Sequence, residues 1–357
     1  METAVTLQVN QANLVKSLQF SFTNQDTCLG EMIQNARRAG ASHVAFDYQA
    51  DTQTLTVTDD GCGIASVSTL LTVAESGWDL DVMANENPFG IGFMSALFAC
   101  QHLTVASKSG SFSAATADIL AFQPIAVSPC RQWDGSTRIT LAEIRLDATS
   151  IERRLKALAK GFPIEVSFNG EALARPHALD SGLAFAGSAV GQIHWAGLDG
   201  PSGKCDEFTV YLQGLPIYQS YQQGSNQHIV HLDSSRFHAR LPDRDKLINE
   251  DEAVQAIKTA LKEGIRQGLL QLKAQLSATA FVLFYPMLRH WGLLPMLNDV
   301  DALPLPVVRE FDGYPVCDSD CHGHFLSRPY GSVEGVVAKF LRLSAVVWQS
   351  LHAVLGR

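Results

Sequence analysis

The stretch "DTCLGEMIQNARRAGASHVAFDY", residues Asp26–Tyr48, joins a helical pattern of apolar residues to an alternating one. Apolar residues recur at helical spacing through its first half, which predicts a helix packed against the core. These residues are Cys28, Leu29, Met32, Ile33, Ala36 and Ala39. Glu31 and Asn35 stand four residues apart inside this pattern and therefore share one face of the helix. A solvated helix face would explain such a pair on its own, so the rest of the chain decides what it means.

After Gly40 the apolar spacing changes to every second residue. Segments 42–48 and 54–60 both alternate, and the polar segment 49–53 between them is typical of a turn, which predicts a β-hairpin. The second strand runs directly into "DDGCGI", residues 59–64. Two glycines at a strand end let the backbone approach a flat ligand closely, and Asp59 there can accept a hydrogen bond from a ligand amino group. D-x-G-x-G is also a common turn sequence.

A second glycine pair follows a long polar connection. Residues 74–90, "AESGWDLDVMANENPFG", are too long for an ordinary connector and indicate a mobile functional segment, with Trp78 in a lid. They lead through Gly90-Ile91-Gly92 into an apolar helix expected at 93–100. A glycine-rich loop that enters a helix offers backbone N–H groups to phosphate. No G-x-x-x-x-G-K-[ST] pattern occurs, and the G-x-G does not follow a strand as a dinucleotide-binding fingerprint would.

The remaining pattern sets the domain organisation. Segments 102–119 and 136–144 alternate as strands, so residues 1–147 are predicted to form an α+β layer sandwich. Further strands and a long amphipathic helix from about Asp251 predict a second α/β domain at 148–275. Residues 276–357 remain as a short helical C-terminal region of unassigned role.

Composition narrows the class of protein. The chain has 357 residues, of which 46% are hydrophobic and 18% charged, as in a well-packed globular protein. The formal net charge of −9 argues against sequence-independent nucleic-acid binding as the main function. The basic segment 151–161, "IERRLKALAKG", is a local exception that an ordinary solvated helix face would also explain.

Cysteine usage and hydropathy indicate a cytoplasmic protein. Seven scattered cysteines form no disulfide framework, which fits a reducing compartment. Residues 1–20 lack the basic start and apolar run of a signal peptide. The most apolar stretch, 280–297, contains Arg289 and two prolines, so we expect it to be buried or to face a partner, and no membrane span is expected.

Taken in order, the motifs resemble those of one superfamily. E-x-x-x-N-A at 31–36, D-x-G-x-G at 59–63 and G-x-G-x-x-S at 90–95 resemble the N, G1 and G2 boxes of the GHKL ATPases, which comprise gyrase, heat-shock chaperone, histidine kinase and MutL. Residues 135–139 resemble the late G-T-x-I strand of these proteins, with Ser136 inserted before Thr137. The resemblance covers about residues 15 to 145 and implies a Bergerat-type ATP-binding sandwich that uses ATP and Mg²⁺.

The resemblance also implies a role for each residue. Glu31 would be the general base that orients and deprotonates the attacking water, and Asn35 would bind Mg²⁺. The other implied nucleotide contacts are Asp59, Gly61, Gly63 and Thr137 on the adenine side, and Gly90, Gly92, Phe93 and Ser95 around the phosphates. Glu31 and Asn35 would then share a face because water and metal both act at the γ-phosphate.

Two branches of the superfamily are similar to this chain. "FGIGFMSALF" and "AESG" look closest to heat-shock chaperones, whereas "VTDDGCGI" and "GEMIQNARRAGAS" fit MutL equally well. Histidine kinases need an upstream phosphoacceptor helix, and the residues before Glu31 contain no histidine. "VYLQGLPI" resembles the transducer domain of the chaperone, gyrase and MutL ATPases. "RDKL" resembles the chaperone segment whose arginine reaches the γ-phosphate, which favours Arg244 for that role, with Lys246 as the alternative and a surface charge cluster as the other interpretation.

The favoured function is a Mg-ATPase whose conformational cycle serves a chaperone-like or remodelling role, with a homodimer or a protein client as partner. The alternatives are a nucleic-acid ATPase similar to MutL, topoisomerase or MORC proteins, and a nucleotide-sensing scaffold without turnover. Near the C-terminus an amphipathic helix at 336–355 would serve docking or dimerisation. Four candidate metal ligands also occur there, in a spacing that fits no usual zinc pattern: Cys317, Cys321, His322 and His324.

Overall fold

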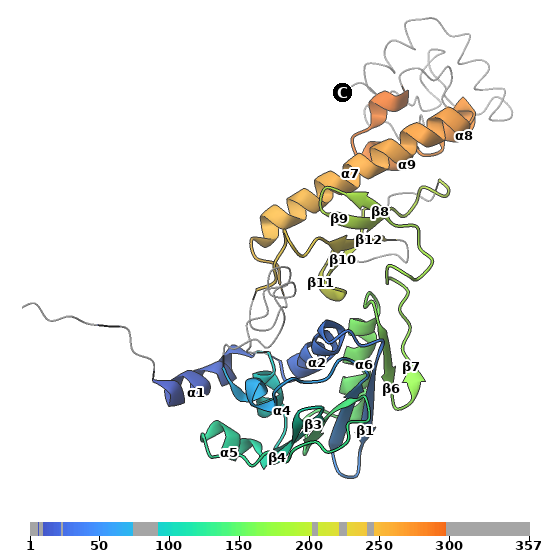
Figure 1. Ribbon diagram of the computed structural model, residues 1–357. Helices are drawn as coiled ribbons and strands as arrows, with labels where there is room; N and C mark the ends of the chain where they lie inside the picture. The colour runs from blue at the N-terminus through green and yellow to red at the C-terminus, as the bar shows by residue number, and fades with distance from the viewer. Residues whose placement is uncertain are drawn as a thin grey trace, which may run out of the picture.

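The computed structural model describes residues 6, 10–22, 24–73, 92–201, 206–220, 227–240 and 246–297. They form a mixed α/β structure with two mixed sheets, stacked along the long dimension of the molecule (Figure 1). The strands of the first sheet are β1 (His43–Gln49), β2 (Thr54–Asp59), β3 (His102–Ser107), β4 (Gly110–Ala115), β5 (Thr137–Ala142), β6 (Glu165–Phe168) and β7 (Glu171–Ala172). Its helices are α1 (Gln11–Ser21), α2 (Thr27–Arg38), η1 (Val67–Leu71), α4 (Met94–Ala99), α5 (Thr116–Leu120) and α6 (Ala148–Ala159).

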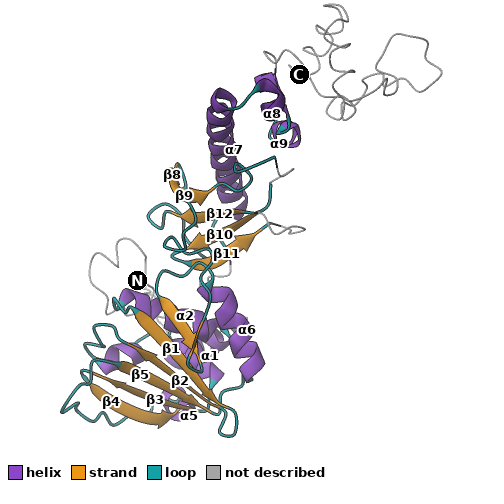
Figure 2. Cartoon of the chain, turned by 90° about the vertical axis from the view of Figure 1, so that its right-hand side faces the viewer, coloured by secondary structure: helices purple, strands orange, loops and turns teal. Residues whose placement is uncertain are grey.

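The first sheet has the order β4-β3-β5-β2-β1-β6-β7 and is covered by helices on one face (Figure 2). Inward residues such as Phe46 and Leu103 are fully buried, in one core with Leu29 and Ile33 of α2. The helix and the hairpin expected on either side of Gly40 are confirmed as α2 and the antiparallel pair β1–β2. The strands and the helices each bury one apolar face, as their period-2 and period-3.6 patterns predicted. The result is a layer of helices on a sheet, which agrees with the predicted sandwich.

The core of this sheet continues beyond residue 147, where the sequence had placed the domain boundary. Strand β6 pairs parallel with β1, with Val166 opposite Val44. Helix α6 buries Ile151 and Leu155 in the same core as α2. A parallel partner needs a long crossover connection and therefore comes from a distant part of the chain. The first packing unit accordingly reaches about Leu173, which is buried in the same core.

The second sheet has the order β11-β10-β12-β9-β8 and packs on a long helix. Its elements are β8 (Ala186–Ser188), β9 (Gly191–His194), β10 (Phe208–Leu212), β11 (Leu215–Gln219), β12 (His228–Leu232) and α7 (Glu250–Gln275). On one face of the sheet, Val210 and Val230 share a core with Ile257 and Leu261 of α7. On β10 the neighbouring Tyr211 is also buried, beside residues that follow α6. Because both faces are covered, every residue of β10 and β12 is buried.

The far half of α7 belongs to a third cluster with α8 (Ala278–Val282), α9 (Tyr285–His290) and η2 (Leu294–Leu297). The apolar stretch 280–297 thus buries residues such as Phe281, Tyr285 and Leu288 in this cluster, while Leu283 stays exposed. Burial was one of the two outcomes expected for this stretch. Gly264 and Gly268 on α7 leave room for Trp195 and Leu198, whose side chains a Cβ at either position would strike. Within the ranges described, none of the helices combines the length and apolarity needed to cross a membrane. The predicted metal ligands and helix after residue 297 lie outside those ranges.

Candidate functional site

Glu31 lies buried on α2 against the chain that enters α4. Only 6% of its surface is exposed, and a Cβ placed on Gly92 would collide with its carboxylate. Residue 92 must therefore be glycine for Glu31 to keep this position. The structure thus brings together the acid of the first motif and the last glycine of the third, which lie 61 residues apart in sequence.

The other end of α2 supports the loop between Asp59 and Gly63. The Cys62 N–H donates to the Ala39 carbonyl at 2.8 Å, and a Cβ on Gly61 would lie 2.7 Å from the Ala39 Cβ. Gly61 therefore permits close approach of this loop to the helix end. At 1.5 Å per residue, Ala39 lies roughly 12 Å along the helix from Glu31. Helix α2 therefore contacts both parts of the predicted ligand site, the one at Glu31 and the one at the loop after Asp59.

Asp59 and Asp60 are adjacent carboxylates with different surroundings. Burial raises the pKa of Asp59, and its Oδ1 accepts a hydrogen bond from the Gly61 N–H at 3.0 Å. Asp60 accepts from the backbone N–H groups of Ser42 and His43 at 2.8 and 3.0 Å. Although burial acts to raise the pKa of Asp60, these bonds and one from the Ser42 hydroxyl lower it. Asp60 therefore fixes the start of β1, and Asp59 is the acid more readily protonated.

Thr137 is buried at the start of β5, opposite Asp59 of β2. Its hydroxyl lies 3.0 Å from that of Ser107, which in turn accepts from the Ile64 N–H at 2.8 Å. Lys108 donates to the Cys62 carbonyl at 2.7 Å. The loop after β2 is therefore held from the β3–β5 side as well as from α2. Sequence patterns predicted a role for Thr137 but gave no indication of Ser107 or Lys108.

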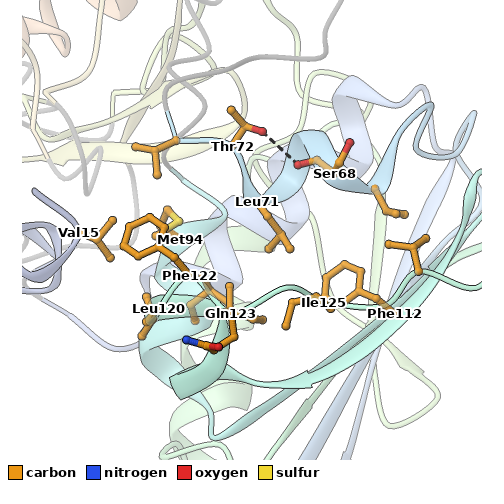
Figure 3. A pocket seen from close by; sticks show the side chains of 15 residues that line it. Val15, Ser68, Leu71, Thr72, Met94, Phe112, Leu120, Phe122, Gln123 and Ile125 are labelled. Atoms are coloured by element: carbon orange, nitrogen blue, oxygen red, sulfur yellow. Dashed lines mark hydrogen bonds between the residues drawn. The ribbon is translucent and has the colours of Figure 1, made fainter. Parts of the chain in front are cut away.

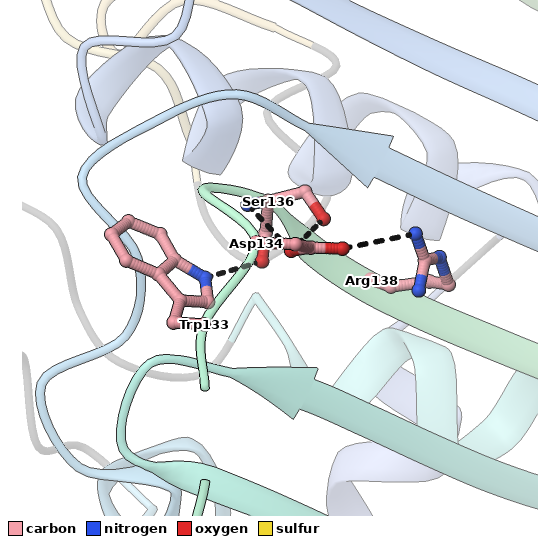
Figure 4. Close-up of polar contacts among 4 residues, drawn as sticks. All are labelled: Trp133, Asp134, Ser136 and Arg138. Atoms are coloured by element: carbon pink, nitrogen blue, oxygen red, sulfur yellow. Dashed lines mark hydrogen bonds and ion pairs between the residues drawn. The ribbon is translucent and has the colours of Figure 1, made fainter. Parts of the chain in front are cut away.

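Trp133 was also missed, and it lies over the same loop. Gly63 has a φ of +74°, and a Cβ there would lie 2.9 Å from Cζ2 of Trp133. The Trp133 indole N–H donates to the Ser136 carbonyl at 2.6 Å, while Asp134 accepts from Ser136 and pairs with Arg138 (Figure 4). The dipeptide Asp134-Gly135 signals a turn, but no local signal indicates a contact between residues 70 positions apart.

Asn35 is half-buried one turn after Glu31, and its Oδ1 lies 3.5 Å from Nη1 of Arg38. Amide and carboxylate oxygens are ligands that Mg²⁺ accepts, and this ion usually takes only one or two protein ligands beside phosphates and water. The side chains at 31 and 35 fit such a requirement. In the described part of the chain, no group of three or more His, Cys, Asp or Glu side chains forms a metal site.

The other predicted site residues are placed only in part. Phe93 and Ser95 are buried at the start of α4, and the Ser95 hydroxyl donates to the Gly92 carbonyl at 2.6 Å, which fixes the turn at Gly92. Gly90 and Arg244 lie outside the described residues, as does the Trp78 segment. Lys246 is exposed, and its carbonyl accepts from the Arg240 N–H at 2.7 Å.

A cavity of about 350 Å³ lies among α1, η1, α4, β4 and α5 (Figure 3). Its lining is mainly apolar and includes Val15, Leu71, Met94, Phe112 and Phe122. None of the predicted site residues lines it. It is therefore separate from the polar residues gathered along α2.

Replacing Asp59 with asparagine should leave the fold intact. The amide can still accept from the Gly61 N–H, and it removes a carboxylate whose ionisation burial opposes. Because the folded-state pKa of Asp59 is raised, the stability linked to this group is present at low pH and lost as the pH rises through that pKa. Asp59→Asn should thus be at least as stable as wild type at pH 7. That advantage should vanish as the pH falls toward the ordinary aspartate pKa of about 3.9.

Urea unfolding across this pH range measures the difference, with exposed Asp47→Asn on β1 as the control. A loss of stability in Asp59→Asn at pH 7 would show that the charge itself supports the fold.

Comparison with known proteins adds one match. Residues 23–126 match the family model described as histidine kinase-, DNA gyrase B- and HSP90-like ATPase. A search of curated proteins found no significant match. The matched segment contains Glu31, Asn35, Asp59 and Gly92, and it ends before Thr137. The match supports a GHKL-type ATPase domain in this segment, and such a domain implies ATP binding.

Proposed function

We propose that the protein is a Mg-dependent ATPase whose base is Glu31. The buried Glu31 carboxylate against Gly92 carries this proposal. A carboxylate withdrawn from bulk water, beside a glycine turn and one helical turn from an amide, can hold a water molecule next to a phosphoryl group. Phosphoryl transfer requires mainly such positioning and electrostatic stabilisation, with little covalent chemistry from the protein.

The remaining residues take the roles that their positions support. Asn35 would hold the Mg²⁺, which supplies positive charge to the phosphate oxygens. Asp59 accepts the hydrogen bond of the adenine amino group, and Trp133 borders that end of the site across Gly63.

A charge-assisted bond is worth about 1.5–3 kcal/mol, so Asp59→Asn should weaken ATP binding by one to two decades in calorimetry. Unchanged affinity would remove the adenine assignment.

We further propose that the second sheet and α7 form a transducer-like domain. Nucleotide would drive a chaperone-like or remodelling cycle in the cytoplasm, either within a homodimer or on a protein client.

The charges of α6 support a protein partner over nucleic acid. Arg154 pairs with Asp26 at 3.5 Å and Lys156 with Glu152 at 2.6 Å, so acidic neighbours offset part of the basic segment. ATPase assays with unfolded protein or with DNA test this choice. Salt-sensitive stimulation by DNA alone would favour the MutL-like alternative.

Glu31→Gln provides the test of the proposed reaction. The amide keeps the shape of the buried side chain beside Gly92 but cannot take a proton from water. The variant should bind Mg-ATP while hydrolysis falls by roughly two to four decades, the usual contribution of a general base. Glu171→Gln, on exposed β7, is the matched control.

Phosphate release and calorimetry on the same samples separate the outcomes. Normal hydrolysis by Glu31→Gln would remove Glu31 from the mechanism. Binding without hydrolysis in the wild-type protein would instead favour the nucleotide-sensing scaffold.

We also propose that a cation from the segment 244–246 acts at the γ-phosphate. Arg244→Ala should lower kcat more than it lowers ATP affinity, because a group that stabilises the transition state contributes mainly to turnover. Lys246→Ala is the matched variant, since its exposed side chain belongs to the same segment. Normal kcat in Arg244→Ala, together with a defect in Lys246→Ala, would transfer the role to the lysine.

A further inference from the structure

A polar contact joins the second sheet directly to α2. Gln34 lies between Glu31 and Asn35 in sequence and has only 1% of its surface exposed. Its side-chain amide donates to the Oε1 of Gln213, in the turn between β10 and β11 and 179 residues away. A buried amide costs stability unless its hydrogen-bonding groups have partners. The helix that carries the proposed base therefore depends on the second sheet for one of these partners.

The orientation of this contact is fixed by a third residue. The Nε of Arg37 donates to the Oε1 of Gln34 at 3.4 Å. Because an arginine can only donate, the oxygen of the Gln34 amide faces Arg37 and its nitrogen faces Gln213. Gln213 must then present an acceptor. A glutamate at position 213 would keep that acceptor, and a residue without a side chain would remove it.

The turn that presents Gln213 is tightly held. Gln213 and Gly214 both have positive φ, +55° and +83°, as expected for a two-residue type I′ hairpin turn. A Cβ on Gly214 would lie 2.6 Å from Cδ of Pro163 and 3.2 Å from the Gly161 carbonyl. A Cβ on Gly161 would in turn collide with the ring of Tyr211. The turn is thus seated on the segment 161–163, which directly follows α6.

Two further contacts hold the strand before this turn and the segment 161–163 beneath it. The Tyr211 hydroxyl lies 2.6 Å from Nδ1 of His177, and the Arg175 guanidinium donates to the Phe162 carbonyl at 2.8 Å. Helix α6 also packs on α2 within the first core. The hairpin, the segment 161–163 and α2 consequently form one packed unit, and a displacement of the hairpin would be transmitted to the helix.

We propose that Gln213 is a positioning residue for ATP hydrolysis, acting through Gln34 to hold α2 so that Glu31 stays aligned. This proposal rests on the proposed function. In this proposal Gln213 acts on α2 and not on the nucleotide, so its loss should leave ATP affinity unchanged and lower turnover. A misplacement of about 1 Å in a catalytic group can cost up to two decades in rate.

The test compares variants that keep the turn. Gln213→Gly removes the side chain and gives Gly-Gly, which suits a type I′ turn, whereas Gln213→Glu keeps the acceptor. Gln213→Asn, with a shorter side chain in another favoured turn sequence, replaces the glycine variant if that one is unstable. Gln219→Ala, exposed at the far end of β11, is the control. With Mg-ATP, kcat should fall roughly tenfold or more in Gln213→Gly with KM unchanged, and stay within about twofold in Gln213→Glu.

Wild-type kcat in Gln213→Gly would overturn the proposal, as would a parallel loss of ATP affinity or a failure of Gln213→Glu to restore turnover. Hydrogen exchange of the amides at 31–38 gives a readout that needs no activity. Exchange there should accelerate in Gln213→Gly and not in Gln213→Glu or Gln219→Ala. If the wild-type protein neither binds nor hydrolyses ATP, the proposed function fails. The exchange pattern then still decides whether Gln213 holds α2, and unchanged exchange would overturn that as well.

Discussion

The Glu31 carboxylate can lie buried beside the chain that enters α4 only because residue 92 has no side chain. This steric condition ties the first motif to the third. Helix α2 must bury an apolar face in the core and keep a polar face beside two glycine loops. Gly92 meets this helix at Glu31, and Gly61 meets it at Ala39. Both glycines are therefore needed for close approach of backbone and helix before any ligand is considered.

Burying polar side chains at the site has an energetic cost, and the structure offsets it with both local and distant partners. The amide of Gln34 is paired with Gln213 and Arg37. Asp59 retains a bond from the Gly61 N–H despite the burial that raises its pKa. Each partner satisfies a group that water would otherwise solvate. The bond from Gln34 to Gln213 also ties α2 to the second sheet, so one bond serves both the stability and the positioning of the helix.

Sequence periodicity predicted the elements whose burial depends on local spacing. Helix α2, the β1–β2 hairpin and the long helix α7 all match the expected segments. The parallel strand β6 was not identified as part of the first sheet, because its partner β1 lies about 120 residues earlier and short strands of either domain look alike. Likewise, Gln213 and Trp133 meet the site across long sequence separations. Such contacts leave no local sequence signal, whereas the glycine motif that Trp133 contacts at Gly63 does have one.

The added strand β6 also explains how the two sheets come to be joined. Helix α6 leads into it through the segment 161–163, and this segment is the surface that receives the β10–β11 turn. The same helix packs on α2. Because tightly packed interiors respond to displacement as units, a change in the second sheet can reach α2 by two routes, through α6 packing and through the Gln213 side chain. Two routes that converge on one helix make its position sensitive to the hairpin without requiring the hairpin to touch the nucleotide.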